Sequence, residues 1–233
     1  MSHFSVMVMT TNDSSSIEEL LEPYYEGNSR APWIEFSRQG AIDYIREHNP
    51  EFKNKSDDEC WQYMARDYET IDKAGNLYAT YNPDARWDYW IEGGRWNGLL
   101  RLKDGTRANS AKIQDIDFTL DQEEYKRALR FWDIIVDHKP LEPDEEKPFQ
   151  FWKEEYYREY FGDRETYARR MAQFSTAAVV TSDGIWCERG TVGWFGCSDE
   201  TPEEAQDWDD NFLQHFIEGE DPATTITIVD CHI

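Results

Sequence analysis

The chain has 233 residues, of which 15% are aromatic, a composition unlike that of a disordered chain, and the length predicts one large folded domain. Its 48 acidic and 24 basic residues give a formal net charge of −24, which repels nucleic-acid phosphates and anionic membranes and argues against direct binding to either. The same charge permits another function, in which an acidic surface imitates nucleic acid and occupies a DNA- or RNA-binding protein. No apolar run approaches the ~20 residues of a membrane span and no basic leader is present, so we expect a soluble, cytoplasmic protein.

The N-terminal part of the chain predicts one strand followed by helices. The apolar run at 4–9 indicates a buried strand. Serines at 14–16 are candidate N-caps of a short helix that Pro23 limits. Helical patterns follow at about 37–47 and 57–68.

Residues 78–102 are rich in tryptophan around a glycine break. Three strands are expected here, joined as aromatic-rich hairpins, at residues 77–81, 86–92 and 96–102. Further along, the pattern predicts an amphipathic helix at 121–138 with Leu129, Trp132, Ile135 and Val136 facing inward, then aromatic-rich helices at about 149–161 and 164–174.

The C-terminal segment predicts two strands, a helix and a last strand. The expected elements are a strand at 176–181, a tight turn at Asp183-Gly184, a strand from Ile185 to Phe195, a helix with a capping box at Thr201 and Glu204, and a strand at 224–232. Together with the first strand and helix, this order is βα…ββαβ, which is typical of the ferredoxin-like split βαβ fold. We therefore predict a single α+β domain, 1–233, with a core of 1–26 plus 175–233 and an insertion at 27–174, whose hairpin part is 77–103 and whose helical part is 120–174.

The two terminal strands are expected to be antiparallel neighbours. Setting His3 opposite His232 then sets Ser5 opposite Asp230, Met7 opposite Ile228 and Met9 opposite Ile226. The other face, with Phe4, Val6 and Val8, is more uniformly apolar and is expected to take the two core helices. We predict His3 and His232 within ~8 Å of each other, on the face that residues 86–96 cover.

The tryptophan-rich segment has the components of a small-molecule pocket, namely aromatic walls, a glycine gap and a guanidinium. Basic residues outnumber acidic ones at 86–107, so an anion could bind there while a base stacks on tryptophan. The alternative is a structural hairpin whose arginines pair with nearby carboxylates. The predicted ligand-binding residues are Trp87, Trp90, Gly93, Gly94, Arg95 and Trp96.

His3, His232 and Asp230 are the candidate catalytic residues. Two histidines that flank a phosphodiester could cleave it by acid–base chemistry, whereas histidines that only donate hydrogen bonds would make a sequestering protein. A strand-end histidine is alternatively structural. The cysteines show no CxxC spacing and no known catalytic motif is present, so no metal and no cofactor are expected.

The chain resembles a family of small bacteriophage-encoded proteins. The resemblance lies in Met1-Ser2-His3-Phe4, Tyr81-Asn82-Pro83, Trp87-Asp88, Gly93-Gly94-Arg95-Trp96, Asp183-Gly184-x-Trp186, Gly193-Trp194-Phe195-Gly196 and Val229-Asp230-Cys231-His232-Ile233. It covers both ends and the middle hairpins but not about 28–75 or 105–174, and it carries no catalytic residues. It implies a phage accessory protein of the host bacterial cytoplasm, directed at host physiology or defence.

The combined prediction is a protein that binds a small anionic, nucleotide-like molecule, by sequestering or cleaving it, to counter host defence signalling. If the histidines act chemically, the protein is a phosphodiesterase-like hydrolase. The alternative is an acidic nucleic-acid mimic that inhibits a host DNA- or RNA-binding protein.

Overall fold

The computed structural model describes residues 3–13, 15–191 and 198–233. They form two compact units, of which the smaller is Pro23–Arg86 and the larger combines Met1–Glu22 with Trp87–Ile233. The secondary structure is mixed α+β, as predicted. The division differs from the predicted single domain with an insertion at 27–174, because residues 87–174 belong to the larger unit.

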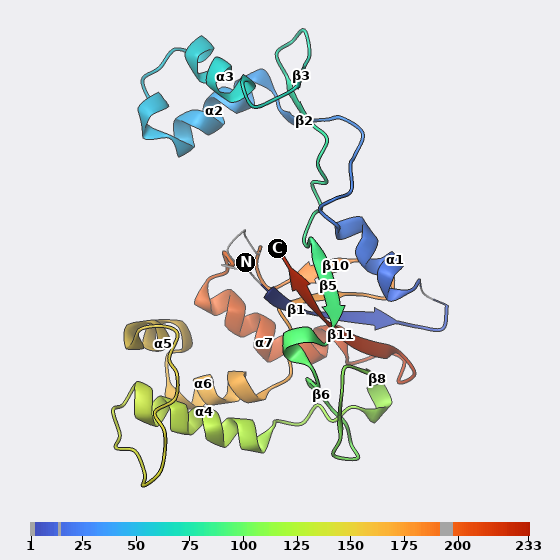
Figure 1. Cartoon of the computed structure of the whole chain (residues 1–233), viewed down its shortest axis with the longest axis vertical. Helices are drawn as coiled ribbons and strands as arrows, with labels where there is room; N and C mark the ends of the chain where they lie inside the picture. Colours follow the sequence, from blue (N-terminus) through green and yellow to red (C-terminus); the bar gives the residue numbers. More distant parts are fainter. Residues whose placement is uncertain (1–2, 14, 192–197) are drawn as a thin grey trace. The chain divides into compact units, whose positions relative to one another are not determined.

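A six-stranded sheet, counted over the described residues, lies at the centre of the larger unit (Figure 1). Its order is β10-β9-β1-β11-β5, and β8 also pairs with β11. The strands are β1 (His3–Thr10), β5 (Tyr89–Glu92), β8 (Ser110–Lys112), β9 (Ala178–Val180), β10 (Trp186–Glu188) and β11 (Thr225–His232).

The terminal strands β1 and β11 pair antiparallel in the predicted register. His3 lies opposite His232, Ser5 opposite Asp230, Met7 opposite Ile228 and Met9 opposite Ile226. Since side chains alternate between the faces of a sheet, this register places both histidines, Ser5 and Asp230 on one face.

The ferredoxin-like strand order is not confirmed. That order would place the second strand of the C-terminal hairpin, β10, beside β1. Instead β9 pairs with β1 in parallel and β10 lies at the sheet edge. The predicted turn between β9 and β10 is present, with Gly184 at φ +84°. Residues 192–197 lie outside the described residues, as do Met1, Ser2 and Ser14. The end of the predicted second strand, at 192–195, and the Gly193–Gly196 motif fall in this range.

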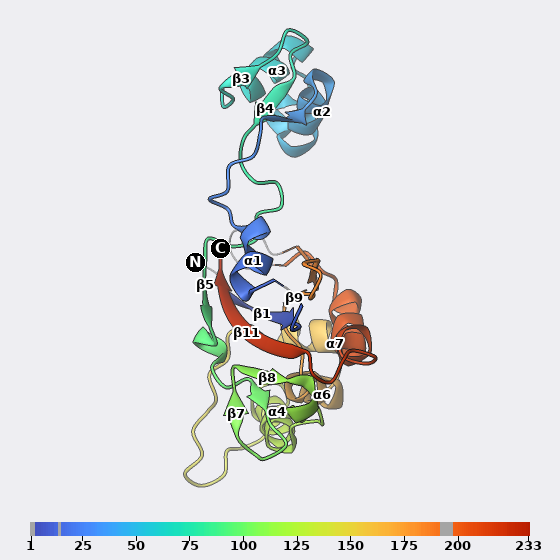
Figure 2. The same cartoon turned by 90° about the vertical axis from the view of Figure 1, so that its right-hand side faces the viewer.

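Helix α7 (Pro202–Phe216) packs on the face of the sheet that carries Met7, Met9 and Ile228 (Figure 2). Its Phe212 is fully buried there, and Trp208 and Phe216 pack against the same cluster. The prediction that the core helices lie on the Phe4, Val6 and Val8 face is therefore wrong for α7. It packs instead on the face that also carries the histidines, because the methionines and isoleucines make that face equally apolar beyond Ser5 and Asp230.

Four further helices belong to the described part of the larger unit. The helix predicted at 121–138 is α4, and its Trp132, Ile135 and Val136 are buried as predicted, with Leu129 partly buried beside them. It begins where the Asp121 carboxylate accepts hydrogen bonds from the next turn. The helices are α1 (Ile17–Leu21), α4 (Gln122–Ile135), α5 (Glu154–Phe161) and α6 (Arg164–Ala172).

The predicted tryptophan hairpins do not form. The three predicted strands belong to three sheets: β4 (Leu77–Ala79) lies in the smaller unit, β5 pairs with β11, and β6 (Leu100–Arg101) pairs with β7 (Arg107–Ala108). The three predicted strands therefore do not pair with one another. Tyr89–Glu92 joins the main sheet at its edge, whereas Gly94–Trp96 lies against the face that carries Asp230 and Met7, so the predicted cover of the histidine face is confirmed for that short segment alone.

The smaller unit contains a three-stranded sheet and two helices, counted within its described residues. Buried Ile42, Ile45 and Cys60 form its core between the helices. The elements are β2 (Trp33–Phe36), α2 (Arg38–His48), α3 (Asp57–Ala65), β3 (Thr70–Ile71) and β4. Short 3-10 helices in the chain are Glu22–Tyr24, Pro50–Phe52, Gly94–Trp96 and Ile113–Asp115. None of the helices in the described segments combines the length and apolar character needed to cross a membrane.

We expect the packing of α4 against α6 to lose stability in acid, as the Asp133 carboxylate takes up a proton. Its carboxylate accepts from Arg164 Nε at 2.6 Å and Lys139 Nζ at 2.8 Å, and the Arg164 hydrogen bond is the main reason that its pKa is lowered from 3.8 to about 2. A folded-state pKa below the unfolded value contributes stability that is present above pH ~4 and lost as pH falls through ~2.

Between pH 5 and pH 2 the natural chain should therefore lose about 2 kcal/mol more unfolding free energy than Asp133→Asn. Urea unfolding at several pH values measures the difference, and parallel pH curves for the two proteins would contradict the assignment.

Candidate functional site

The two histidines of the terminal strands are in direct contact. Their ring centroids lie 4.9 Å apart at 70°, which confirms the predicted proximity. His3 is the first residue of β1 and His232 the last of β11, so the antiparallel register brings the two chain ends together.

Asp230 orients His3. Its Oδ1 lies 2.8 Å from His3 Nδ1, and its Oδ2 accepts a hydrogen bond of 2.9 Å from the backbone N–H of Arg95. Asp230 is 2% exposed, so both carboxylate oxygens require partners within the protein. A carboxylate accepting at Nδ1 places the ring proton there and leaves His3 Nε2 as the basic nitrogen.

The predicted glycine break lets the backbone approach the Asp230 carboxylate closely. Gly94 has φ +50°, and a Cβ there would lie 2.4 Å from the Cβ and Oδ2 of Asp230. A glycine is therefore required so that the backbone can bring the N–H of Arg95 onto Asp230. The break is used for an internal contact, whereas the sequence interpretation assigned it to a ligand.

A second histidine–aspartate contact lies beside the first. His232 Nδ1 is 2.6 Å from Asp88 Oδ1, and the backbone N–H of Asp88 donates to the carbonyl of His232 at 2.9 Å. His232 is 5% exposed, and its Nε2 is buried without a hydrogen-bond partner among the described residues. A buried polar atom without a partner is uncommon, and it leaves the hydrogen-bonding capacity of His232 Nε2 unused in this structure.

Tyr89 joins the two histidines. Its ring stacks on His232 with centroids 4.5 Å apart at 18°, and its hydroxyl lies 3.4 Å from His3 Nε2. Tyr89 is 47% exposed and pairs with His232 across β5 and β11, so it reaches the same face of the sheet.

A cavity of about 280 Å³ opens beside this cluster, near the lower end of the ~300–1,000 Å³ common for small-molecule sites. His3, Ser5, Trp96, Thr176 and Arg189 are among its lining residues. The Arg189 guanidinium pairs with Glu200 at 3.0 Å. His3 is thus the member of the histidine pair that lines the cavity, and His232 contacts His3.

The predicted tryptophans are divided between different roles. Trp96 lines the cavity, whereas Trp87 is 8% exposed and its indole N–H donates to the carbonyl of Leu21. Trp90 pairs with Cys231, so it lies on the opposite face from His232. The prediction that Trp87, Trp90 and Trp96 together wall the histidine face is therefore wrong for Trp87 and Trp90, because β5 joins the sheet as a strand.

The arginines of the segment are also divided. Arg101 pairs with Asp117 and Asp121, and Arg107 pairs with Asp121, as the structural alternative predicted. The Arg95 side chain is exposed and makes no ion pair with any residue of the described ranges. Arg95 is thus the arginine of this segment whose charge is least compensated.

Two site residues, Asp88 and Tyr89, were missed by the sequence interpretation. Both stand in the tryptophan-rich segment that the sequence singled out, but their roles depend on the pairing of β5 with β11. Cys231, at the same end of the sheet, is fully buried, and burial raises the pKa of its thiol. It is therefore an inert core side chain and no nucleophile.

Among the residues that the structure describes, no group of three or more His, Cys, Asp or Glu side chains is placed to hold a metal ion. The site is instead a cluster of hydrogen-bonded imidazoles, carboxylates and a phenol. Comparison of the chain with protein-family models, with curated proteins and with solved structures found no match.

Proposed function

We propose that this site binds a small anionic, nucleotide-like molecule and cleaves its phosphodiester by acid–base catalysis. The observation that carries the proposal is the contact between two histidines, each with a carboxylate on Nδ1, beside a cavity that His3 lines. A carboxylate that fixes the tautomer and the ring orientation is the arrangement by which a histidine serves as general acid or base.

The proposed reaction is hydrolysis that starts with a neutral His3 imidazole. His3 Nε2 removes a proton from water as the water oxygen forms a bond to phosphorus. The P–O bond to the leaving group breaks, and the protonated His3 gives its Nε2 proton to the leaving oxygen. The products are a phosphomonoester and an alcohol, and His3 is neutral again. His232 contacts His3 without lining the cavity, so its role is to position the His3 ring.

Binding would use the parts of the predicted pocket that lie at the cavity. Trp96 lines the cavity and offers a ring on which a base can stack. Arg95 precedes Trp96 in the chain and is outside the cavity lining, and it offers an exposed guanidinium without an ion pair in the described residues. A phosphate that accepts from Arg95 would gain ~1.5–3 kcal/mol from a charged hydrogen bond.

The resemblance to bacteriophage-encoded proteins supplies the context of this proposal. In that context, the protein acts in the cytoplasm of an infected bacterium on a nucleotide-like signal of the host. Turnover distinguishes a hydrolase from a protein that only sequesters the signal.

The nucleic-acid mimic is the alternative, and it rests on net charge alone. Several carboxylates serve the fold itself, as N-caps at Asp121 and Asp163 and as capping-box partners at Glu59 and Glu204. Such carboxylates are positioned by helix ends, and their spacing need not follow that of duplex phosphates.

Binding is tested by thermal unfolding of the protein with a panel of mononucleotides, dinucleotides and cyclic dinucleotides. A ligand at 100 times its Kd should add about 2.7 kcal/mol to the unfolding free energy. Arg95→Ala should remove more than half of that gain, because the phosphate loses a charged hydrogen bond.

Arg127→Ala is the matched control, since Arg127 is an exposed arginine of α4 that pairs with Glu124. Its thermal shift should equal that of the natural chain. Equal shifts for Arg95→Ala and Arg127→Ala, or no shift with any member of the panel, would refute the proposed binding site.

A further inference from the structure

The smaller unit contains a second candidate site, and its lining is acidic, whereas the first site is proposed to bind an anion. A cavity of about 460 Å³ lies against the sheet of β2, β4 and β3. Its lining includes three carboxylates and three tyrosines: Glu35, Asp67, Glu69, Tyr68, Tyr78 and Tyr81. All of these residues belong to one compact unit, Pro23–Arg86.

Glu35 is the centre of this cluster. The hydroxyl of Tyr68 donates to one of its carboxylate oxygens at 2.7 Å, and the hydroxyl of Tyr81 donates to the other at 2.6 Å. The pairing of β2 with β4 shifts register between Ile34 and Phe36, at the position of Glu35. Such irregularities re-aim a side chain, and this one places the carboxylate between the two phenols.

The tyrosines remain neutral donors at physiological pH. Burial and the hydrogen bond to Glu35 raise the pKa of Tyr81 to about 12, and the same causes raise the pKa of Tyr68. Each oxygen of Glu35 accepts a hydrogen bond from one phenol hydroxyl and keeps a lone pair for another donor. The cluster thus presents acceptors and aromatic faces.

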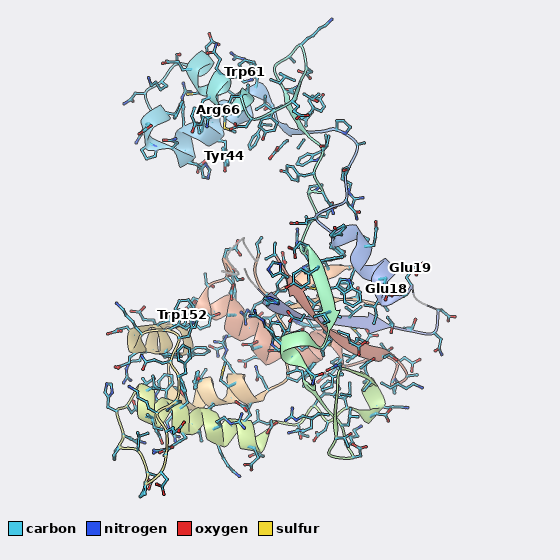
Figure 3. All side chains as sticks on the ribbon, in the orientation of Figure 1. Glu18, Glu19, Tyr44, Trp61, Arg66 and Trp152 are labelled. Carbon is cyan, nitrogen blue, oxygen red and sulfur yellow. The ribbon has the colours of Figure 1, made fainter. Side chains whose placement is uncertain are left out.

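Two of the three carboxylates that line the cavity are not paired with a basic side chain in the described ranges. Glu35 and Glu69 have no ion pair with a basic residue in the described ranges. Asp67 pairs with Arg66 at 3.3 Å, but both side chains are more than half exposed. The Arg66 guanidinium, labelled in Figure 3, stacks at 3.7 Å on Tyr63, outside the cavity lining. An anion would be repelled here, whereas a cation would meet carboxylates together with phenol rings.

We propose that this cavity binds an organic cation that carries N–H donors, either a guanidinium or an ammonium group. Glu35 accepts its hydrogen bonds, Glu69 and Asp67 add attraction at the rim, and the tyrosine rings contact its face. The source is a free amine or a basic side chain of another protein. This site does not rest on the function proposed for the histidine cluster.

The test is calorimetric titration of the full chain at low ionic strength with two peptides, acetyl-Gly-Arg-Gly-amide and the same peptide with citrulline in place of arginine. Citrulline keeps the shape but has a carbonyl oxygen in place of one NH₂ group, so it lacks the charge and some of the N–H donors. The arginine peptide should bind at least tenfold more tightly, and equal affinity of the two peptides would overturn the proposal.

Glu35→Gln should weaken binding of the arginine peptide at least tenfold, because it removes the central charge. Glu69→Gln, at an exposed position, should weaken it severalfold without risk to the fold. Glu47→Gln removes an exposed carboxylate from α2 of the same unit and should leave affinity within twofold. If Glu69→Gln and Glu35→Gln both match Glu47→Gln, the site is refuted.

Agmatine, a free guanidinium amine, separates the two sources of the cation. Tighter binding of agmatine than of the arginine peptide supports a small-molecule amine, and the reverse order supports a basic protein segment. Absence of binding by both probes at millimolar concentration refutes the site.

Discussion

His3→Gln is expected to lower phosphodiester hydrolysis by ~10²–10⁴-fold, the usual contribution of a general acid or base. The substitution removes the imidazole of a residue that lines the cavity while it keeps a polar side chain of similar length. His232→Gln should cause a smaller loss, since His232 contacts and positions His3 but does not line the cavity. The measurement is the rate with bis(4-nitrophenyl) phosphate and with each nucleotide that raises the melting temperature.

The matched control for the histidines is His215→Gln. His215 is an exposed histidine of α7 in the same unit, and its replacement should leave the rate unchanged. Melting temperatures of all three variants establish that the fold is retained. If a nucleotide binds and the natural chain shows no turnover, sequestration replaces hydrolysis as the function of the site. Equal rates for His3→Gln and His215→Gln would contradict catalysis by the histidine pair.

Asp209→Asn is expected to destabilise the larger unit by ~3–5 kcal/mol, because it leaves a buried cation without its partner. Arg170 of α6 donates from Nε to Asp209 of α7 at 2.8 Å, and their side chains are 1% and 6% exposed. Ser175 donates to the other carboxylate oxygen at 2.9 Å, and the guanidinium lies over the rings of Tyr160 and Phe161. Urea unfolding measures the loss.

The adjacent residue provides the control for this prediction. Asp210 pairs with Arg169 between the same two helices, but those side chains are 29% and 42% exposed. Asp210→Asn should therefore cost ~1 kcal/mol or less, since water screens the pair. Replacing both buried partners, as Arg170→Met with Asp209→Leu, should restore most of the stability lost in Asp209→Asn. Equal effects of Asp209→Asn and Asp210→Asn would contradict the assigned role of burial.

Local signals in the sequence predicted the helices well. The helix predicted at 121–138 is α4, because its apolar residues recur at helical spacing, and α7 begins at the predicted Thr201 capping box. The register of β1 and β11 was also predicted, since the alternation of side chains makes a one-residue slip costly when both strands are buried.

The sequence predicted poorly which strands pair with each other and which face of the main sheet α7 covers. The tryptophan-rich segment reads as hairpins of three strands, yet β4 and β5 pair with strands distant in sequence, and β6 pairs with the following strand β7. Both faces of β1 are apolar along most of its length, so hydrophobicity did not decide which face α7 would cover. The hairpin of β9 and β10 was predicted, but either of its strands could pair with β1 by composition alone.

By itself, the sequence determined which residues share a face of the terminal strands, and so it brought His3, Ser5, Asp230 and His232 together. The tertiary structure alone decided what these residues contact. Asp88 and Tyr89 reach the histidines only because β5 adds to the edge of β11, and Gly94 approaches Asp230 for the same reason. The periodicity of side chains is a local property of the backbone, whereas strand pairing depends on the relative free energies of distant contacts, which no local pattern encodes.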